Sequence, residues 1–160
     1  MQKIFFSLFL FFIFVNATIF QETAAIPPLN QKIIDYVNTV IKKKVDRGEC
    51  WDLANKALTL VNAQWDKKYT YGQLVNPEKD TIYPGDIIQF YGVKMKYKVG
   101  KEEYTEEAKH HTAIVYKVKA KGVYDIAHQN TGFSGRKVGI SEIDLATVTK
   151  WKLKFYRPVQ

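Results

Sequence analysis

The sequence contains a single cysteine, Cys50, among 160 residues. A lone thiol has no partner within its own chain, so an intramolecular disulfide framework is excluded. Only five prolines and nine glycines are present, and the sequence shows no internal repeat, low-complexity linker or phosphate-binding glycine loop. These absences exclude a repeat array and a string of linked modules, and they favour one globular domain.

One long hydrophobic run is present, and it lies at the N-terminus, from Ile4 to Val15. A helix that spans a bilayer needs about 20 apolar residues, so this run is too short and is typical of a secretory signal peptide. We expect a signal peptide over residues 1–17, with cleavage after Ala17 or as late as residue 25. Export would leave about 135 to 143 residues, enough for one domain with a hydrophobic core. The alternative is an uncleaved form tethered to the membrane.

Positive charge is in excess, since 24 Lys and Arg residues stand against 16 Asp and Glu, a formal net charge of +8. Exported basic proteins often meet anionic envelope polymers, membrane surfaces or nucleic acids. Many of the lysines alternate with apolar residues, as in 117–121 and 150–154, which is typical of a strand with one face in solvent. We interpret the charge first as a solvated surface and second as a patch for anionic envelope polymers. We expect a monomer and no nucleic-acid partner.

The hydrophobic periodicity changes from helical to strand-like along the chain. Apolar residues spaced by three and four predict a helix over 31–45, with Asn30 as its N-cap, and a second helix from Cys50 to about residue 63. Residues 65–83, rich in Tyr, Lys, Asn and Gly, predict a loop that frames a surface groove. The later alternation predicts a series of strands joined by turns and one polar hairpin or loop, at 87–91, 96–109 (the hairpin or loop), 111–118, 123–129, 137–140 and 151–156. Helices followed by antiparallel strands predict an α+β fold.

Cys50 stands at the start of the second predicted helix, after the break that Gly48 provides. The unpaired amides and the dipole of a helix N-terminus favour an anion, so we expect this position to lower the pKa of the thiol and to supply thiolate. One alternative is a buried cysteine that packs as a small hydrophobic residue. Another is an intermolecular disulfide through Cys50, which predicts a doubled mass on non-reducing gels.

An imidazole that is able to serve Cys50 lies on a later predicted strand. A thiol hydrolase needs a thiolate, an imidazole that takes and returns protons, and a polar group that orients the imidazole. His111 opens a strand and shares a face with Ala113 and Val115, whereas its neighbour His110 points the other way. We therefore favour His111 as the base, although a histidine on an apolar face is more often a core residue with satisfied hydrogen bonds.

Two candidates for the orienting group follow on the next predicted strand. Alternation places His128 and Asn130 on one face and Gln129 on the other. Either His128 or Asn130 is able to hydrogen-bond the nitrogen of His111 that faces away from sulfur. The alternative for Asn130 is a turn residue before Thr131. Zinc is a competing use of one cysteine and three histidines, but none of them has close ligand spacing, so we expect no metal or cofactor.

Four short motifs occur in an order that resembles a known family. They are Gly48-Glu49-Cys50-Trp51, Pro84-Gly85-Asp86-Ile87-Ile88, His111-Thr112-Ala113-Ile114-Val115 and His128-Gln129-Asn130. Together they resemble the CHAP domains, which are cysteine, histidine-dependent amidohydrolases/peptidases related to the NlpC-type papain-like enzymes. The resemblance covers roughly half of the chain, from Gly48 to Asn130. The resemblance implies a CHAP-like papain-fold domain over 30–160, with N-terminal helices packed on a small antiparallel β-sheet.

The resemblance also implies the roles of the residues. Cys50 would be the nucleophile, His111 the general base and acid, and the backbone N–H of Cys50 part of the oxyanion hole. The family often has an acidic residue at the position of His128, followed two places later by Asn130. A neutral histidine does not stabilise an imidazolium as a carboxylate does, so Asn130 is the preferred orienting residue.

The sequence therefore predicts a secreted thiol amidohydrolase or peptidase that needs no cofactor. Family members commonly cleave amide bonds in peptidoglycan, so the expected substrate is a peptidoglycan or other peptide. The alternative is a catalytically weak papain-like fold that acts as a secreted binding module, which the histidine at position 128 favours.

Overall fold

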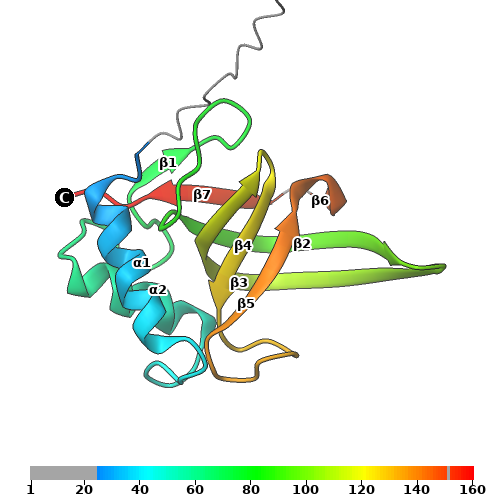
Figure 1. Ribbon diagram of the computed structural model, residues 1–160, viewed down its shortest axis with the longest axis horizontal. Coiled ribbons are helices and arrows are strands. Elements are labelled where there is room, and N and C mark those ends of the chain that lie inside the picture. The colour runs from blue at the N-terminus through cyan, green and yellow to red at the C-terminus, as the bar shows by residue number, and fades with distance from the viewer. Residues whose placement is uncertain (1–24, 151) are drawn as a thin grey trace, which may run out of the picture.

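The protein is described by a computed structural model, which describes residues 25–150 and 152–160. The predicted signal peptide and Trp151, at the start of the last predicted strand, lie outside the described residues. The described part has a helical N-terminal segment followed by strands (Figure 1). Its elements are α1 (Pro28–Val40), α2 (Cys50–Leu60), β1 (Gln73–Val75), β2 (Ile87–Val99), β3 (Glu102–Ala120), β4 (Val123–His128), β5 (Gly139–Asp144), a 3₁₀ turn η1 (Leu145–Thr147), β6 (Val148–Lys150) and β7 (Leu153–Arg157).

Helix α1 begins earlier than predicted, because a proline supplies its first turn. Pro28 occupies the first helical position, where its missing N–H would have no intrahelical partner in any case. Asn30 therefore lies inside the helix, and the prediction that it caps the helix is wrong. Its buried side-chain amide donates instead to the Pro84 carbonyl oxygen (3.0 Å) and to Asp86 Oδ1 (2.8 Å). Asn30 thus ties α1 to the turn that leads into β2.

That turn allows a close approach that only glycine tolerates. Gly85 has a φ of +89°, and a Cβ at this position would lie 2.6 Å from the Asn30 carbonyl oxygen. Next to it, Asp86 is fully buried and accepts from the Tyr83 N–H (2.9 Å) and from Arg157 Nη2 (3.0 Å). Burial raises the pKa of Asp86, and its hydrogen bonds lower it without full compensation. The turn therefore joins α1, β2 and β7 through one buried carboxyl group.

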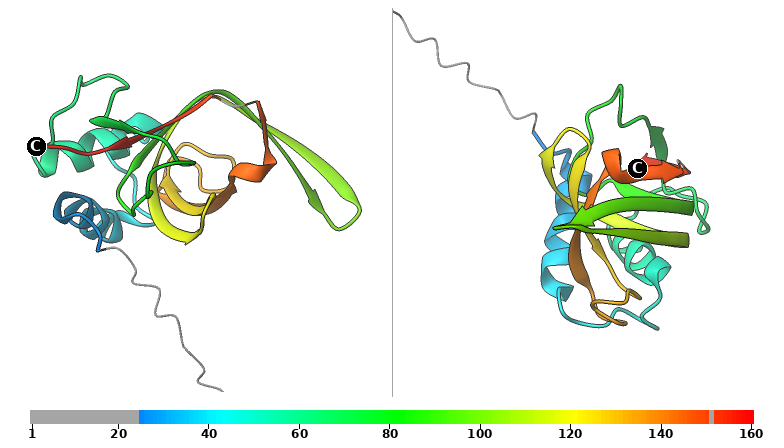
Figure 2. Two further views of the ribbon diagram at one scale, coloured as in Figure 1. Left: turned by 90° about the horizontal axis from the view of Figure 1, so that it is seen from above. Right: turned by 90° about the vertical axis from the view of Figure 1, so that its right-hand side faces the viewer.

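The strands form a seven-stranded antiparallel sheet in the order β1-β7-β2-β3-β4-β5, with β6 also paired to β2. Strands β2 and β3 make a long hairpin whose tip projects beyond the rest of the sheet (Figure 1). This hairpin includes the polar segment predicted as a hairpin or loop. Its outer part is held by cross-strand pairs, including a stack of Tyr97 on Tyr104 with ring centroids 5.6 Å apart. The sheet curls, and both helices lie on one side of it (Figure 2).

The curled sheet has hydrophobic residues on both of its faces. One core lies between the helices and the sheet and joins residues such as Leu53 and Leu58 of α2 to Ile114 of β3. The other lies on the opposite face of the sheet and contains Ala113 and Phe155 among its members. The predicted order of helices and antiparallel strands is confirmed, but the sheet is larger than the small sheet that we expected. The sheet therefore packs hydrophobic residues on the face away from the helices as well.

The lysines of the two alternating segments are exposed, as predicted, and they lie at positions 117, 119, 121, 150, 152 and 154. Their neighbours on β7, such as Leu153 and Phe155, are buried. None of the helices within 25–150 and 152–160 has the length and apolar character needed to cross a membrane.

Candidate active site

The loop before Cys50 is shaped by a glycine and a buried carboxylate. Gly48 has a φ of +86°, and a Cβ there would lie 2.7 Å from Cβ of Arg136, so the chain passes too close for another residue. Asp52 Oδ2 accepts from the backbone N–H groups of Glu49 and Arg47, each at 3.0 Å, and Oδ1 pairs with the Arg47 guanidinium at 2.6 Å. Burial raises the pKa of Asp52, but the hydrogen bonds from Arg47 and Glu49 and the charge of Arg47 lower it by more. The pKa therefore lies below its ordinary value. Asp52 is therefore ionised, and its carboxylate accepts from the N-cap residue of α2, the helix whose first residue is Cys50.

Gln129 joins this loop to the end of β4. Its side chain is fully buried. Nε2 donates to the carbonyl oxygens of Val45 (3.0 Å) and Glu49 (2.8 Å), while Oε1 accepts from the Val45 N–H (3.2 Å). Gln129 was predicted to face away from His128 and to have no role in the site; the separation of faces is confirmed, whereas its role in holding the loop was not foreseen. Gln129 stands between His128 and Asn130, the two candidates for orienting His111, and this position is the feature of the sequence that could have identified it.

The thiol of Cys50 is half-buried at the first turn of α2. Burial raises its pKa, and the Glu49 carboxylate acts in the same direction. Three backbone N–H groups lower the pKa but do not compensate for the burial, and they belong to Thr112, Trp51 and Cys50 itself. The expectation that the helix start lowers the thiol pKa is therefore wrong in its net result, because desolvation outweighs the amides. The hydrogen bond from Thr112 places the sulfur beside the strand that carries His111.

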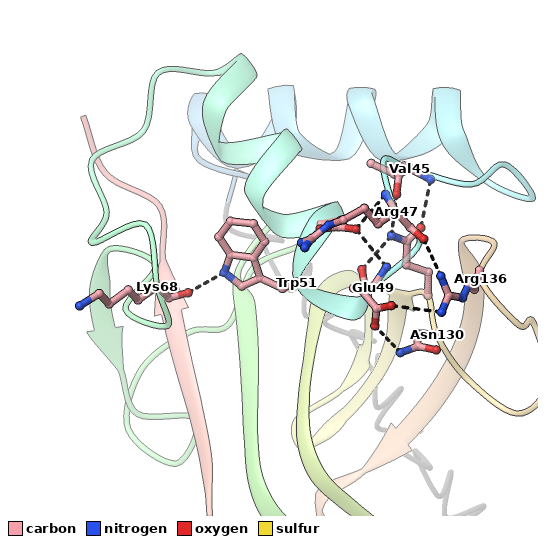
Figure 3. Close-up of polar contacts among 9 residues, drawn as sticks. Val45, Arg47, Glu49, Trp51, Lys68, Asn130 and Arg136 are labelled. Carbon is pink, nitrogen blue, oxygen red and sulfur yellow. Dashed lines mark hydrogen bonds and ion pairs between the residues drawn. The ribbon is translucent and has the colours of Figure 1, made fainter.

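A hollow of about 400 Å³ opens beside the thiol. The loop between α2 and β1 forms one wall, as the sequence predicted, and Trp51 holds this wall by donating its Nε1–H to the Lys68 carbonyl oxygen at 2.7 Å (Figure 3). Trp51 also packs on Trp65, with ring centroids 5.7 Å apart. The hollow is lined by Arg47, Glu49, Cys50, Trp51, Lys67, Lys68, Tyr69 and His110. It therefore combines aromatic surface with several cationic side chains.

Beneath the start of α2 lies a buried polar cluster formed by Tyr71, Gln89 and Thr112. The Tyr71 hydroxyl donates to Gln89 Oε1 (3.0 Å), and Thr112 Oγ1 donates to the same oxygen (2.7 Å). Burial raises the pKa of Tyr71, so its hydroxyl stays protonated at neutral pH. The cluster fixes Thr112, whose backbone N–H meets the Cys50 thiol.

His111 and His128 are brought together on the face of the sheet that carries Ala113. His111 Nε2 and His128 Nδ1 are 2.9 Å apart, and His128 Nε2 lies 2.9 Å from Ser141 Oγ. Burial lowers the pKa of His111 to about 4, with a smaller contribution from His110, and it lowers the pKa of His128 to about 3, with a contribution from His111. Both rings are therefore neutral at pH 7. Ser141, on β5, had no place in the sequence analysis, because strand patterns do not show which side chains meet across a sheet.

Asn130 lies apart from His111. Its amide donates to Glu49 Oε2 at 2.8 Å (Figure 3), on the side of the loop that carries Cys50. Strand β4 ends at His128, and Asn130 has a left-handed φ of +63°, so strand alternation does not extend to it. The prediction that His128 and Asn130 share a face is therefore wrong. The side chain in hydrogen-bond contact with His111 is that of His128.

His110 and His111 point to opposite faces of β3, as the alternation predicted. His110 is exposed and lines the hollow beside Cys50, with its ring edge-on to Tyr69 at a centroid distance of 4.4 Å. His111 lines a wider groove of about 1320 Å³, which continues past His110 between the hairpin and β5. The two hollows thus meet at His110. Across the described ranges, no three His, Cys, Asp or Glu side chains are grouped so that they could hold a metal ion.

The chain is similar to a known protein family and to two solved structures. Residues 28–160 match the family described as the AIM3/BBC1 cysteine proteinase-fold domain. Two crystal structures of Ly7917, one of them with "the hydrolyzing product of MDP", are 15% identical to the chain, with TM-scores of 0.45 and 0.47. The similarity covers 79% and 81% of this chain and 62% of the Ly7917 chain, so the chain spans less than two thirds of that protein's length. No curated protein sequence matches the chain.

Proposed function

Because the chain belongs to the AIM3/BBC1 cysteine proteinase-fold family, we propose that it is a thiol hydrolase that cleaves amide bonds, with Cys50 as nucleophile and His111 as general base and acid. One observation carries the proposal. The thiol of Cys50 meets the backbone N–H of Thr112, the residue after His111, while Nε2 of His111 is held by His128. Nδ1 of His111 makes no hydrogen bond within the described part of the chain, so in the proposed reaction this nitrogen is the one that exchanges a proton.

The resting pair is a neutral thiol and a neutral imidazole, since burial raises the pKa of Cys50 and lowers that of His111. His111 therefore takes the thiol proton as sulfur attacks the carbonyl carbon, instead of storing an ion pair beforehand. The N–H of Cys50 at the start of α2 faces the developing oxyanion, and one such donor is worth about 3 kcal/mol. His111 then protonates the leaving amine. Water then attacks the thioester while the imidazole takes a proton from that water, and His111 passes this proton to the departing Cys50 sulfur as the acid product leaves.

The first substrate to test is a peptide of peptidoglycan, as the resemblance to CHAP domains implies. Two features support an anionic substrate. The chain has a formal net charge of +8, and Arg47, Lys67 and Lys68 line the hollow beside the thiol. Peptide stems with free carboxylates and the anionic polymers around them suit such a surface. An ordinary polypeptide is the other amide substrate to compare.

The test compares the wild-type protein with Cys50→Ala on purified peptidoglycan and on an unfolded polypeptide, with mass analysis of the fragments. We expect fragments from the wild type and none from Cys50→Ala, because no other residue forms the thioester. Thr59→Ala, at an exposed position of the same helix, is the matched control and should cleave like the wild type. Cleavage by Cys50→Ala at the wild-type rate would refute the proposal, and the fragment masses identify the bond.

A second candidate function is a binding module whose thiol is silent. The raised pKa of Cys50 and a histidine in the position of a carboxylate favour it. Iodoacetamide alkylation of Cys50 in the wild type and in His111→Gln separates the two candidates. A hydrolase should alkylate more slowly when the imidazole is removed, whereas a silent thiol should alkylate at the same rate in both proteins.

Export is also a proposal, because the N-terminal hydrophobic run lies outside the described residues. The sequence of the mature N-terminus tests it. We expect the secreted protein to begin at Thr18 or at a later residue up to position 26. Secretion of a chain that still begins at residue 1 or 2 would refute cleavage.

A further inference from the structure

Four charged side chains line the hollow beside the thiol, and two of them are paired with other residues. The Arg47 guanidinium pairs with Asp52 at 2.6 Å, and Glu49 pairs at 3.4 Å with a guanidinium group in the loop after β4. The other two are Lys67 and Lys68, and neither makes an ion pair within the described part of the chain. The unpaired charge of the hollow is therefore positive, and it lies on the wall formed by the loop between α2 and β1.

Lys67 and Lys68 belong to a tight turn whose shape is fixed by Asp66. Asp66 Oδ1 accepts from the N–H groups of Lys68 (2.7 Å) and Thr70 (3.0 Å), and the Asp66 N–H donates to the Thr70 carbonyl oxygen (3.2 Å). On its other side, the turn is tied to α2 by the hydrogen bond from Trp51 to the Lys68 carbonyl oxygen. The main chain of the turn is thus held from both sides, and it presents its side chains from a fixed frame.

Of the two lysines, Lys67 is the one held against the aromatic wall of the hollow. Its ammonium group lies 4.8 Å from the centre of the Trp65 ring, which packs on Trp51. The side chain of Lys68, in contrast, extends away from Trp51 (Figure 3). Lys67 also has a left-handed φ of +58°, a conformation that glycine or asparagine adopts at lower cost than lysine. The backbone gains nothing from a lysine at this position, so the contribution of Lys67 is its ammonium group.

We propose that Lys67 determines the specificity of the hollow by binding a carboxylate of the substrate close to the scissile amide. A positioned ammonium group without a protein anion forms a charge-assisted hydrogen bond with an anion that enters the hollow. A volume of about 400 Å³ corresponds to a hollow roughly 9 Å across, which an extended chain spans in about three residues. The carboxylate therefore belongs to a residue next to the bond that Cys50 attacks, either as a C-terminal α-carboxylate or as an acidic side chain. This inference rests on the proposed function, because Cys50 defines that bond.

Binding of short peptides to the full chain carrying Cys50→Ala tests this subsite without any turnover. The probes are N-acetyl-alanyl-alanine, its C-terminal amide, and N-acetyl-glutamyl-alanine amide, and binding is followed by the indole N–H NMR signals of Trp51 and Trp65. We expect at least one of the two acids to bind about tenfold more tightly than the neutral amide, and the acid that does so identifies the source of the carboxylate. If neither acid binds more tightly than the neutral amide, the proposal is wrong even if the protein proves to be a hydrolase. A preference for an acid would stand even if no amide bond is cleaved.

Lys67→Met in the same background tests the residue itself. Methionine keeps most of the side-chain length over Trp65 but removes the charge, so the affinity for the preferred acid should fall about tenfold while that for the neutral amide stays unchanged. Lys67→Arg keeps the charge and should retain most of the affinity for the acid. Lys68→Met removes a charge from the same turn and is the matched control, with an expected change of less than about twofold. Equal losses in Lys67→Met and Lys68→Met would show that net charge alone attracts the acid, which would contradict the role of Lys67.

Discussion

Gln129 is the best place to test how the thiol is held, because its side chain bonds Val45 and Glu49, which lie 84 and 80 residues before it in the sequence. The substitution Gln129→Leu keeps a side chain of similar volume but removes all three of its hydrogen bonds. The carbonyl oxygens of Val45 and Glu49 and the N–H of Val45 then lose these partners. A net loss of about 1 kcal/mol for each bond predicts a fall of about 3 kcal/mol in the free energy of unfolding.

The assay is urea unfolding followed by tryptophan fluorescence. With a urea m-value of about 1.5 kcal/mol per molar, the expected loss lowers the midpoint by about 2 M. Gln73→Leu, at an exposed position of β1, is the matched control and should change the free energy of unfolding by less than about 0.5 kcal/mol. A midpoint for Gln129→Leu within about 0.2 M of the wild type, about a tenth of the expected shift, with an unchanged m-value, would show that these bonds do not hold the Cys50 loop.

Three further predictions concern charge and backbone strain. Because the pKa values of His111 and His128 are lowered to about 4 and about 3 in the folded protein, stability should fall as the pH drops below about 6.5, by up to about 1.4 kcal/mol per pH unit for each ring, and unfolding of the double variant H111Q/H128Q should depend less on pH. Arg157→Met leaves the buried Asp86 without its cation and should lower the free energy of unfolding by about 3 kcal/mol, part of which a second substitution, Asp86→Asn, should restore. Gly85→Ala forces a Cβ against backbone atoms of Asn30 and should destabilise by more than 2 kcal/mol (about twice the φ penalty alone), whereas Gly100→Ala, with open space around it, should cost only about 1 kcal/mol; equal thermal shifts for the two glycine variants would contradict the crowding.

The sequence predicted the elements whose periodicity reflects burial on one side. The two helices, the strands around Ile114 and Phe155, and the position of Cys50 at a helix start all follow from such patterns. The three-residue strands β1 and β6 were missed, because so few residues show no period. The outer part of β3 is exposed on both faces, which removes the alternation that would have marked it as strand.

For the candidate site, the sequence predicted only which side chains share a face of the same strand. Alternation placed His111 with Ala113 correctly, yet it contains no distances across the sheet, so the contact with Ser141 was invisible. Asn30 shows a related limit, because a residue that commonly caps helices is used here to bind a buried turn. The net pKa of the thiol also depends on tertiary burial, which the first turn of a helix does not reveal.

The end of β4 has a consequence for how the site could change. His128 and Gln129 are neighbours in sequence but serve opposite sides of the sheet, one bonding the imidazole and the other the loop of the thiol. A slip of β4 by one residue would exchange the two faces, and both halves of the site would be lost together. The register of β4 therefore controls both halves of the candidate site at once.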